Sequence, residues 1–81
     1  MESMVMTCLR FWYKKCRAVS HDGTIRVGPT PYYGITVAYE AILYGKELGW
    51  LSEEERSDRS SVRKIKFTKL GEVFFALETN D

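Results

Sequence analysis

Six basic side chains crowd one short stretch near the C-terminal end of the chain. Between positions 56 and 69, a single acid, Asp58, accompanies six cations: Arg56, Arg59, Arg63, Lys64, Lys66 and Lys69. Guanidinium and ammonium groups bind phosphate oxygens through charge-assisted hydrogen bonds. The stretch therefore predicts contact with a polyanion, and the alternative is an ordinary hairpin whose charges are only solvated.

Charge is also segregated along the rest of the chain, although the net charge of the 81 residues is only +1. Residues 10–26 sum to +4, because Arg10, Lys14, Lys15, Arg17 and Arg26 outnumber Asp22. Residues 40–55 sum to −4, with five glutamates and Lys46. Segregation of this kind indicates an electrostatic footprint for a charged partner. Solvated helix faces are the alternative.

No arrangement of residues points to catalysis or to a metal. His21 has Asp22 beside it but no nucleophile in the pattern that a catalytic pair needs. One histidine and two cysteines do not supply the spacing of a zinc site. We therefore predict no catalytic residue, no metal and no cofactor.

The two cysteines, Cys8 and Cys16, are too few for a disulfide framework. On one helix, eight residues separate their Cα atoms by about 12 Å, which is too far for a bridge between them. We expect free, buried thiols, with an intersubunit disulfide as the alternative. No apolar run is long enough to span a bilayer, and Arg10 interrupts any signal-peptide core. The prediction is a soluble protein of the cytoplasm, or of the host cell interior if the protein is viral.

The chain is predicted to form one domain in which helices and short strands alternate. From residue 3 to residue 19, apolar side chains recur at helical spacing: Val5, Leu9, Trp12, Cys16 and Val19. Residues 24–27 are a short strand candidate between glycines. At this length only about 60% of the unfolded surface is buried on folding, so oligomerisation would add stability.

The middle of the chain admits two interpretations. A short turn of helix at residues 31–33 stops at Gly34, and Thr36 caps a second helix that runs to Leu48. The alternative is one helix from Pro31 to Leu48 that tolerates Gly34. In either case we expect one inward face, made of Ala38, Ala41, Ile42, Gly45 and Leu48. Gly49 is expected to end the helix as a left-handed cap.

A hairpin and a last helix complete the chain. Residues 50–55 and 62–67 are predicted strands. In the second strand we expect Ile65 and Phe67 to point inward and Lys64 and Lys66 to point outward. Thr68 is predicted to cap the last helix, whose inward stripe would be Leu70, Val73, Phe74 and Leu77. Phe75 falls off that stripe, so we expect it to face a partner subunit.

Residues 37–51 resemble the recognition helix and exit turn of winged-helix regulators of the MarR and PadR type. In that family the helix ends in Glu-Leu-Gly, here Glu47 to Gly49, and two apolar strand residues follow. Residues 57–63 and 67–72 are similar to the family's wing, where an Asp/Arg-rich tip precedes a strand ending in Leu-Thr-x-x-Gly. The size also resembles that of small winged-helix proteins of archaeal viruses, phages and plasmids.

The resemblance implies an α+β winged helix-turn-helix: helix, short strand, short helix, recognition helix, β-hairpin wing and C-terminal helix. It implies a small dimeric transcription regulator that binds double-stranded DNA. The DNA-binding residues would be Thr36, Tyr39, Glu40, Leu43, Tyr44, Lys46, Arg56, Arg59, Arg63, Lys64 and Lys66. The homodimer contact would use Leu9, Trp12, Cys16, Phe74, Phe75 and Leu77.

The chain departs from the family pattern on the outer face of its predicted recognition helix. Family members usually carry Ser, Thr, Arg, Gln or Asn there, whereas this chain carries Tyr39, Glu40, Leu43, Tyr44 and Lys46. Such a surface also suits a protein partner, because aromatic residues are enriched at interface cores. The alternative function is therefore a protein-interaction module on the same fold, anchored by Tyr39, Leu43 and Tyr44.

Overall fold

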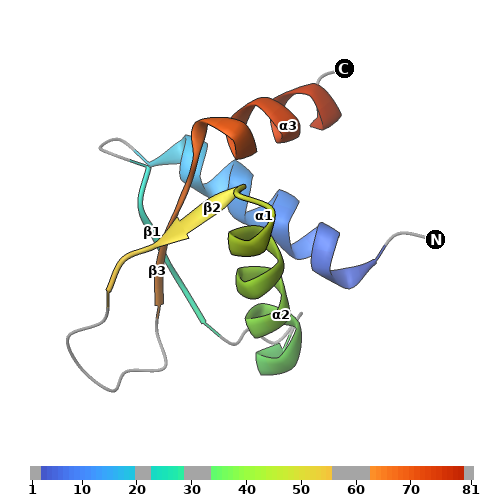
Figure 1. Ribbon diagram of the computed structural model, residues 1–81, viewed down its shortest axis with the longest axis vertical. Helices are drawn as coiled ribbons and strands as arrows, with labels where there is room; N and C mark the ends of the chain where they lie inside the picture. The colour runs from blue at the N-terminus through green and yellow to red at the C-terminus, as the bar shows by residue number, and fades with distance from the viewer. Residues whose placement is uncertain (1–2, 20–22, 29–33, 56–62, 80–81) are drawn as a thin grey trace.

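The computed structural model describes residues 3–19, 23–28, 34–55 and 63–79 (Figure 1). Along the chain the elements are α1 (Met4–Ala18), β1 (Ile25–Val27), α2 (Gly34–Glu47), β2 (Leu51–Glu53), β3 (Arg63–Phe67) and α3 (Lys69–Thr79). The α+β class is confirmed. The predicted helical turn at residues 31–33 and the hairpin tip with Arg56 and Arg59 lie outside the described residues. None of the described helices has the length and apolar character that a membrane span requires.

The three strands form one antiparallel sheet with β3 in the centre, in the order β1-β3-β2. Ile25 lies opposite Ile65, and Leu51 lies opposite Phe67. Ile65 and Phe67 are buried while Lys64 and Lys66 are exposed, which confirms the predicted alternation. One face of the sheet thus packs on the helices and the other faces solvent.

Helix α1 begins where the sequence predicts. The Ser3 side chain caps it by accepting a hydrogen bond from the Met6 N–H at 3.1 Å. The predicted stripe is buried at Leu9, Trp12 and Cys16, but Val19 is exposed and follows the helix end.

Both cysteines are free and buried, as predicted. Burial raises the pKa of Cys8 to about 12 and that of Cys16 to about 11. An intersubunit disulfide through Cys8, which has no exposed surface, would require the core to open.

Helix α2 begins at Gly34 rather than at a Thr36 cap, which is a correction to the prediction. Gly34 has φ +73°, so a single right-handed helix from Pro31 cannot run through it. Gly49, with φ +76°, ends the helix region as predicted. Four residues of the predicted inward face are buried, whereas the fifth, Leu48, is exposed.

Helix α3 is rotated about its axis relative to the prediction, so that of the predicted stripe only Phe74 packs against the core. Phe75, expected to face a partner, is fully buried, whereas Leu70, Val73 and Leu77 are 58%, 49% and 74% exposed. The cause is Gly71, where a Cβ atom would overlap the backbone carbonyl of Trp50. This close approach directs Phe75, one turn later, inward.

The aromatic core lies where α1, α3 and the sheet meet. The Phe75 ring contacts the rings of Tyr13, Trp50 and Phe67, with centroid distances of 5.2–5.7 Å. Figure 1 shows α3 crossing the top of the molecule, with α2 in front of α1 and the sheet on the left.

Candidate nucleic-acid interface and the surface around helix α2

Three cations lie on the solvent face of the sheet: Arg26, Lys64 and Lys66, here called the basic sheet face. Arg26 on β1 is directly opposite Lys64 on β3, and all three side chains are exposed. Like charges at directly opposed positions repel each other and weaken a sheet. The arrangement therefore gives nothing to the fold, but it would attract a polyanion.

One acid partly offsets this charge. Lys64 Nζ lies 3.9 Å from Glu54 Oε2, and the two side chains are 48% and 60% exposed. An ion pair this open to solvent contributes little. The basic sheet face thus retains two net positive charges, from three cations and one acid.

Arg26 was absent from the predicted site, although its place between Ile25 and Val27 on a short strand signals an outward side chain.

Arg63 and Lys46, both predicted to contact DNA, make hydrogen bonds to Glu53 of the same chain. Arg63 Nη2 donates to Glu53 Oε1 at 2.6 Å, and Arg63 Nε donates to Glu53 Oε2. Lys46 Nζ, from α2, donates to Glu53 Oε1 at 3.1 Å. The Arg63 guanidinium also lies over the Tyr39 ring, 5.2 Å from its centroid. We call this set of four residues the Glu53 network.

The Arg63–Glu53 pair at the centre of the network is shielded from solvent, whereas the Lys46 side chain is 43% exposed. The side chains of Arg63 and Glu53 are 13% and 8% exposed. The hydrogen bonds from Arg63, more than those from Lys46, hold the pKa of Glu53 below its ordinary value. Because Lys46 comes from α2 while Glu53 and Arg63 come from the hairpin, the network fixes the helix to the hairpin.

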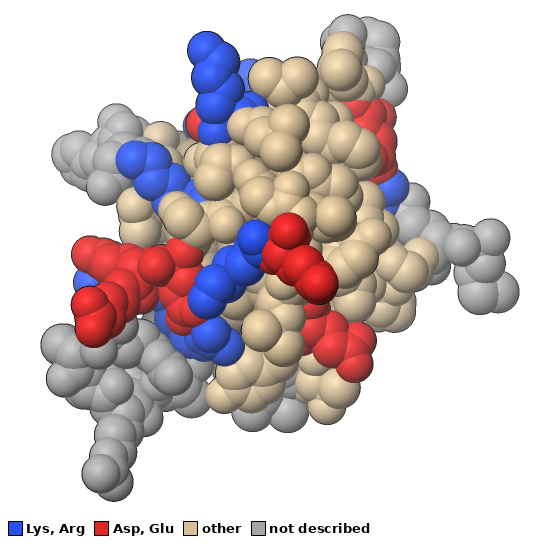
Figure 2. Space-filling view, viewed as in Figure 1, with Lys and Arg blue, Asp and Glu red and all other residues tan. Residues whose placement is uncertain are grey.

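The outer face of α2 is exposed, as a base-reading helix requires, but its chemistry is apolar and acidic. Thr36, Tyr39, Glu40, Leu43 and Tyr44 are all accessible, and Leu43 is 61% exposed. Figure 2 shows the face formed by α2 and α3: uncharged atoms cover most of it, and basic and acidic atoms lie side by side over α2. The described residues thus form no continuous basic ridge on this face.

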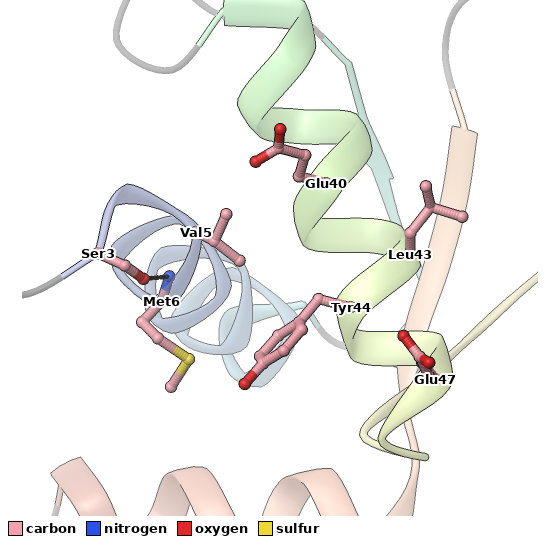
Figure 3. Close-up of a pocket in the computed structure, with 7 residues that line it drawn as sticks. All are labelled: Ser3, Val5, Met6, Glu40, Leu43, Tyr44 and Glu47. Atoms are coloured by element: carbon pink, nitrogen blue, oxygen red, sulfur yellow. Dashed lines mark hydrogen bonds between the residues drawn. The ribbon is translucent and has the colours of Figure 1, made fainter.

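A groove runs between the start of α1 and the outer face of α2 (Figure 3). It has a volume of about 400 Å³. The residues that line this α1–α2 groove are Ser3, Val5, Met6, Glu40, Leu43, Tyr44 and Glu47. In Figure 3 the Tyr44 side chain lies between the two helices, with Glu40 and Glu47 on either side of it along α2.

Most residues of the predicted dimer contact are inside the monomer. Leu9, Trp12, Cys16 and Phe75 are at most 8% exposed, so they build the core. Phe74 is half-buried against Trp50, with ring centroids 4.4 Å apart, and Leu77 is exposed. The exposed apolar surface of α3 is formed by Leu70, Val73 and Leu77, here called the α3 stripe.

Within residues 3–19, 23–28, 34–55 and 63–79, no three His, Cys, Asp or Glu side chains are grouped as a metal site would require. Comparison of the chain with protein-family models, with curated proteins and with solved structures gave no match.

Proposed function

We propose that the protein binds double-stranded DNA through the backbone phosphates, with the basic sheet face as the principal contact surface. The observation that carries this proposal is the opposed pair Arg26 and Lys64, extended by Lys66 on the same exposed face. Lysine and arginine side chains that contact phosphates position a protein on DNA without reading its sequence.

The order of the elements supports the winged-helix interpretation. A helix, a short strand, a second helix, two paired strands and a last helix follow one another, which agrees with the implied order except for the short helix, whose predicted residues lie outside the described ranges. In this order α2 takes the place of the family's recognition helix and β2 and β3 take the place of the wing, but we expect the basic sheet face, not α2, to contact the DNA.

Binding is expected to depend on the backbone more than on sequence. Base edges in the major groove are read by Arg, Lys, Asn, Gln, Ser and Thr. On α2 the exposed side chains near the hairpin are Tyr39, Glu40, Leu43 and Tyr44, and Lys46 is held by Glu53. Little specific readout can therefore come from this helix.

The binding proposal is tested by the salt dependence of duplex affinity. Three phosphate contacts predict a slope of about −2.7 for log K against log salt, from roughly 0.9 per contact. Lys64→Gln combined with Lys66→Gln is expected to make this slope shallower by about 1.8, to about −0.9. The same double variant should bind the duplex more than tenfold more weakly in about 0.1 M salt.

The matched control is Lys14→Gln with Lys15→Gln, which removes the same charge from the exposed part of α1. Fluorescence anisotropy with a labelled duplex measures all three proteins. Equal losses in the two double variants, or no binding by the parent protein at low salt, would reject the basic sheet face.

We also propose that two copies pair through the α3 stripe. In an antiparallel pair centred between positions 73 and 74, Leu70 lies opposite Leu77, and Val73 opposite Phe74. The same register places Lys69 opposite Glu78, which already accepts a hydrogen bond from Arg10 of its own chain. The α3 surface of one copy thus matches the same surface of the second copy, apolar against apolar and basic against acidic, as a twofold contact requires.

Sedimentation equilibrium tests the pairing. Leu70→Ser with Leu77→Ser is expected to give a monomer that keeps its helical content, because both side chains are exposed in the monomer. A parent protein that stays monomeric at millimolar concentration would contradict the pairing.

A further inference from the structure

We infer that the α1–α2 groove is a docking site for an amphipathic helix of a partner protein that carries basic residues on its polar face. The inference uses residues outside the basic sheet face and does not depend on DNA binding.

The centre of the groove is apolar and accessible. Leu43 and Tyr44 are 61% and 45% exposed, and Val5 and Met6 are half-buried beside them. Tyr44 is held in place by an edge-on contact with the Trp50 ring, with centroids 5.8 Å apart. Exposed apolar side chains gathered in a groove between two helices match the way amphipathic helices are bound.

The rim of the groove is acidic. Glu40 and Glu47 are seven residues apart on α2, so they lie on one face of the helix about 10.5 Å apart along its axis. Within the part of the chain that the structure describes, neither carboxylate makes a hydrogen bond or an ion pair. Both carboxylates are therefore available to a cationic partner, and both would repel a nucleic acid or an anionic membrane.

The spacing defines the chemistry of the partner. Along α2 the exposed pattern is acid, then an apolar pair three and four residues on, then acid again: Glu40, Leu43, Tyr44 and Glu47. A partner helix that lies along α2 can pair with both glutamates when it has Lys or Arg at positions i and i+7. It can contact Leu43 and Tyr44 when it also has Leu, Ile or Phe at i+3 and i+4. The charge pattern thus favours a basic helix over an acidic or purely apolar one.

The test is isothermal titration calorimetry of the full chain with a synthetic helical peptide that has Lys at i and i+7 and Leu at i+3 and i+4. The control peptide has Glu in place of the two Lys residues. We expect the basic peptide to bind with a Kd on the order of 10 µM and the acidic peptide to bind at least tenfold more weakly.

Variants of the protein locate the site. Glu40→Gln with Glu47→Gln should weaken the basic peptide about tenfold, whereas Glu55→Gln with Glu72→Gln, an equal charge change at exposed positions elsewhere, should not. Leu43→Ala should weaken it by several-fold without loss of the fold, because Leu43 is largely exposed.

Three results would overturn the inference: no binding of the basic peptide at millimolar concentration, equal binding of the two peptides, or equal losses in the two double variants. The titrations contain no DNA, so they stand whether or not the duplex experiments succeed.

Discussion

The basic sheet face and the α1–α2 groove differ in charge and in chemistry, although the sequence pattern assigns parts of both to one DNA surface. The first has three exposed cations, two of them directly opposed. The second has an apolar centre and two unpaired glutamates within the described residues. A position in a fold therefore does not assign a function, because the side chains at that position decide what can bind.

The Glu53 network lies between these two regions and explains part of their difference. It uses two cations, Lys46 and Arg63, that would otherwise add positive charge at the junction of α2 and the hairpin. Glu53 offsets one of these two positive charges, and both cations are directed to it rather than to the outer surface of α2. Variants of the core packing, of the Glu53 network or of one region alone can each test whether the basic sheet face and the α1–α2 groove are separate surfaces.

The largest effect is expected from Gly71→Ala, which should disable both regions together. A methyl group at this position overlaps the Trp50 carbonyl, and backbone atoms cannot swing aside as a flexible side chain could. We expect a loss of about 3 kcal/mol in the free energy of unfolding, measured by urea denaturation. Ala76→Gly on the same helix is the control and should cost about 1 kcal/mol through helix propensity alone. Equal effects of the two changes would mean that the contact between Gly71 and the Trp50 backbone is looser than described.

Glu53→Gln should uncouple the two regions. It leaves the shielded Arg63 guanidinium without a counter-charge, so we expect a loss of about 2 kcal/mol at pH 7. The pKa of Glu53 is lowered in the folded protein, so its stabilisation is present above the ordinary pKa of a glutamate. It is lost as the pH falls through the lowered value.

The difference in unfolding free energy between the parent protein and Glu53→Gln should therefore shrink as the pH falls below about 4. Urea denaturation at pH 7 and in acid measures it, with Glu55→Gln as an exposed control. A difference that is the same at both pH values would show that Glu53 does not act through its charge.

Thr68→Val tests the bond that joins the end of α2 to the start of α3. The Thr68 hydroxyl donates to the Gly49 carbonyl and accepts from the Gly71 N–H at 3.1 Å. Valine keeps the shape and loses both bonds, so we expect a loss of about 1 kcal/mol in thermal or urea denaturation. Thr36→Val, at an exposed position on α2, should change stability by less than about 0.5 kcal/mol. A smaller loss at Thr68 than at Thr36 would exclude the capping role.

The smallest effect is expected on the basic sheet face itself. Arg26→Gln removes the repulsion from Lys64 and should stabilise the protein by about 0.3 kcal/mol at low salt. The gain should vanish in about 1 M salt, where the charges are screened. Lys14→Gln is the control. A destabilisation at position 26 would show that the opposed cations are held by favourable contacts, and would weaken the case for a surface shaped for an anion.

Much of the fold could be predicted from the sequence, because the local signals agree with the packing. The alternation of Ile65 and Phe67 with lysines gave the correct inner and outer faces of β3. Ser3 and Gly49 marked the start of α1 and the exit from α2. These features depend on a residue and its near neighbours, which a sequence displays directly.

The face of α3 could not be chosen from apolar spacing alone, since Leu70, Val73 and Leu77 form as regular a stripe as the residues that are buried. The overlooked signal was Gly71, which marks the closest approach to another backbone and therefore places Phe75, four residues on, inside. Arg26 and the Glu53 network could not be predicted either. The opposed cations depend on the pairing of β1 with β3, and the network depends on the position of α2 beside the hairpin, both of which are long-range contacts.

The most direct test of the separation between the two regions is a ¹⁵N-edited NMR titration of the protein with a short DNA duplex. We predict that amide shifts concentrate in residues 25–27 and 63–67 and leave residues 40–47 nearly unchanged. Shifts concentrated in residues 36–47, with the sheet unaffected, would contradict the account, because they would place DNA on the acidic and apolar surface of α2.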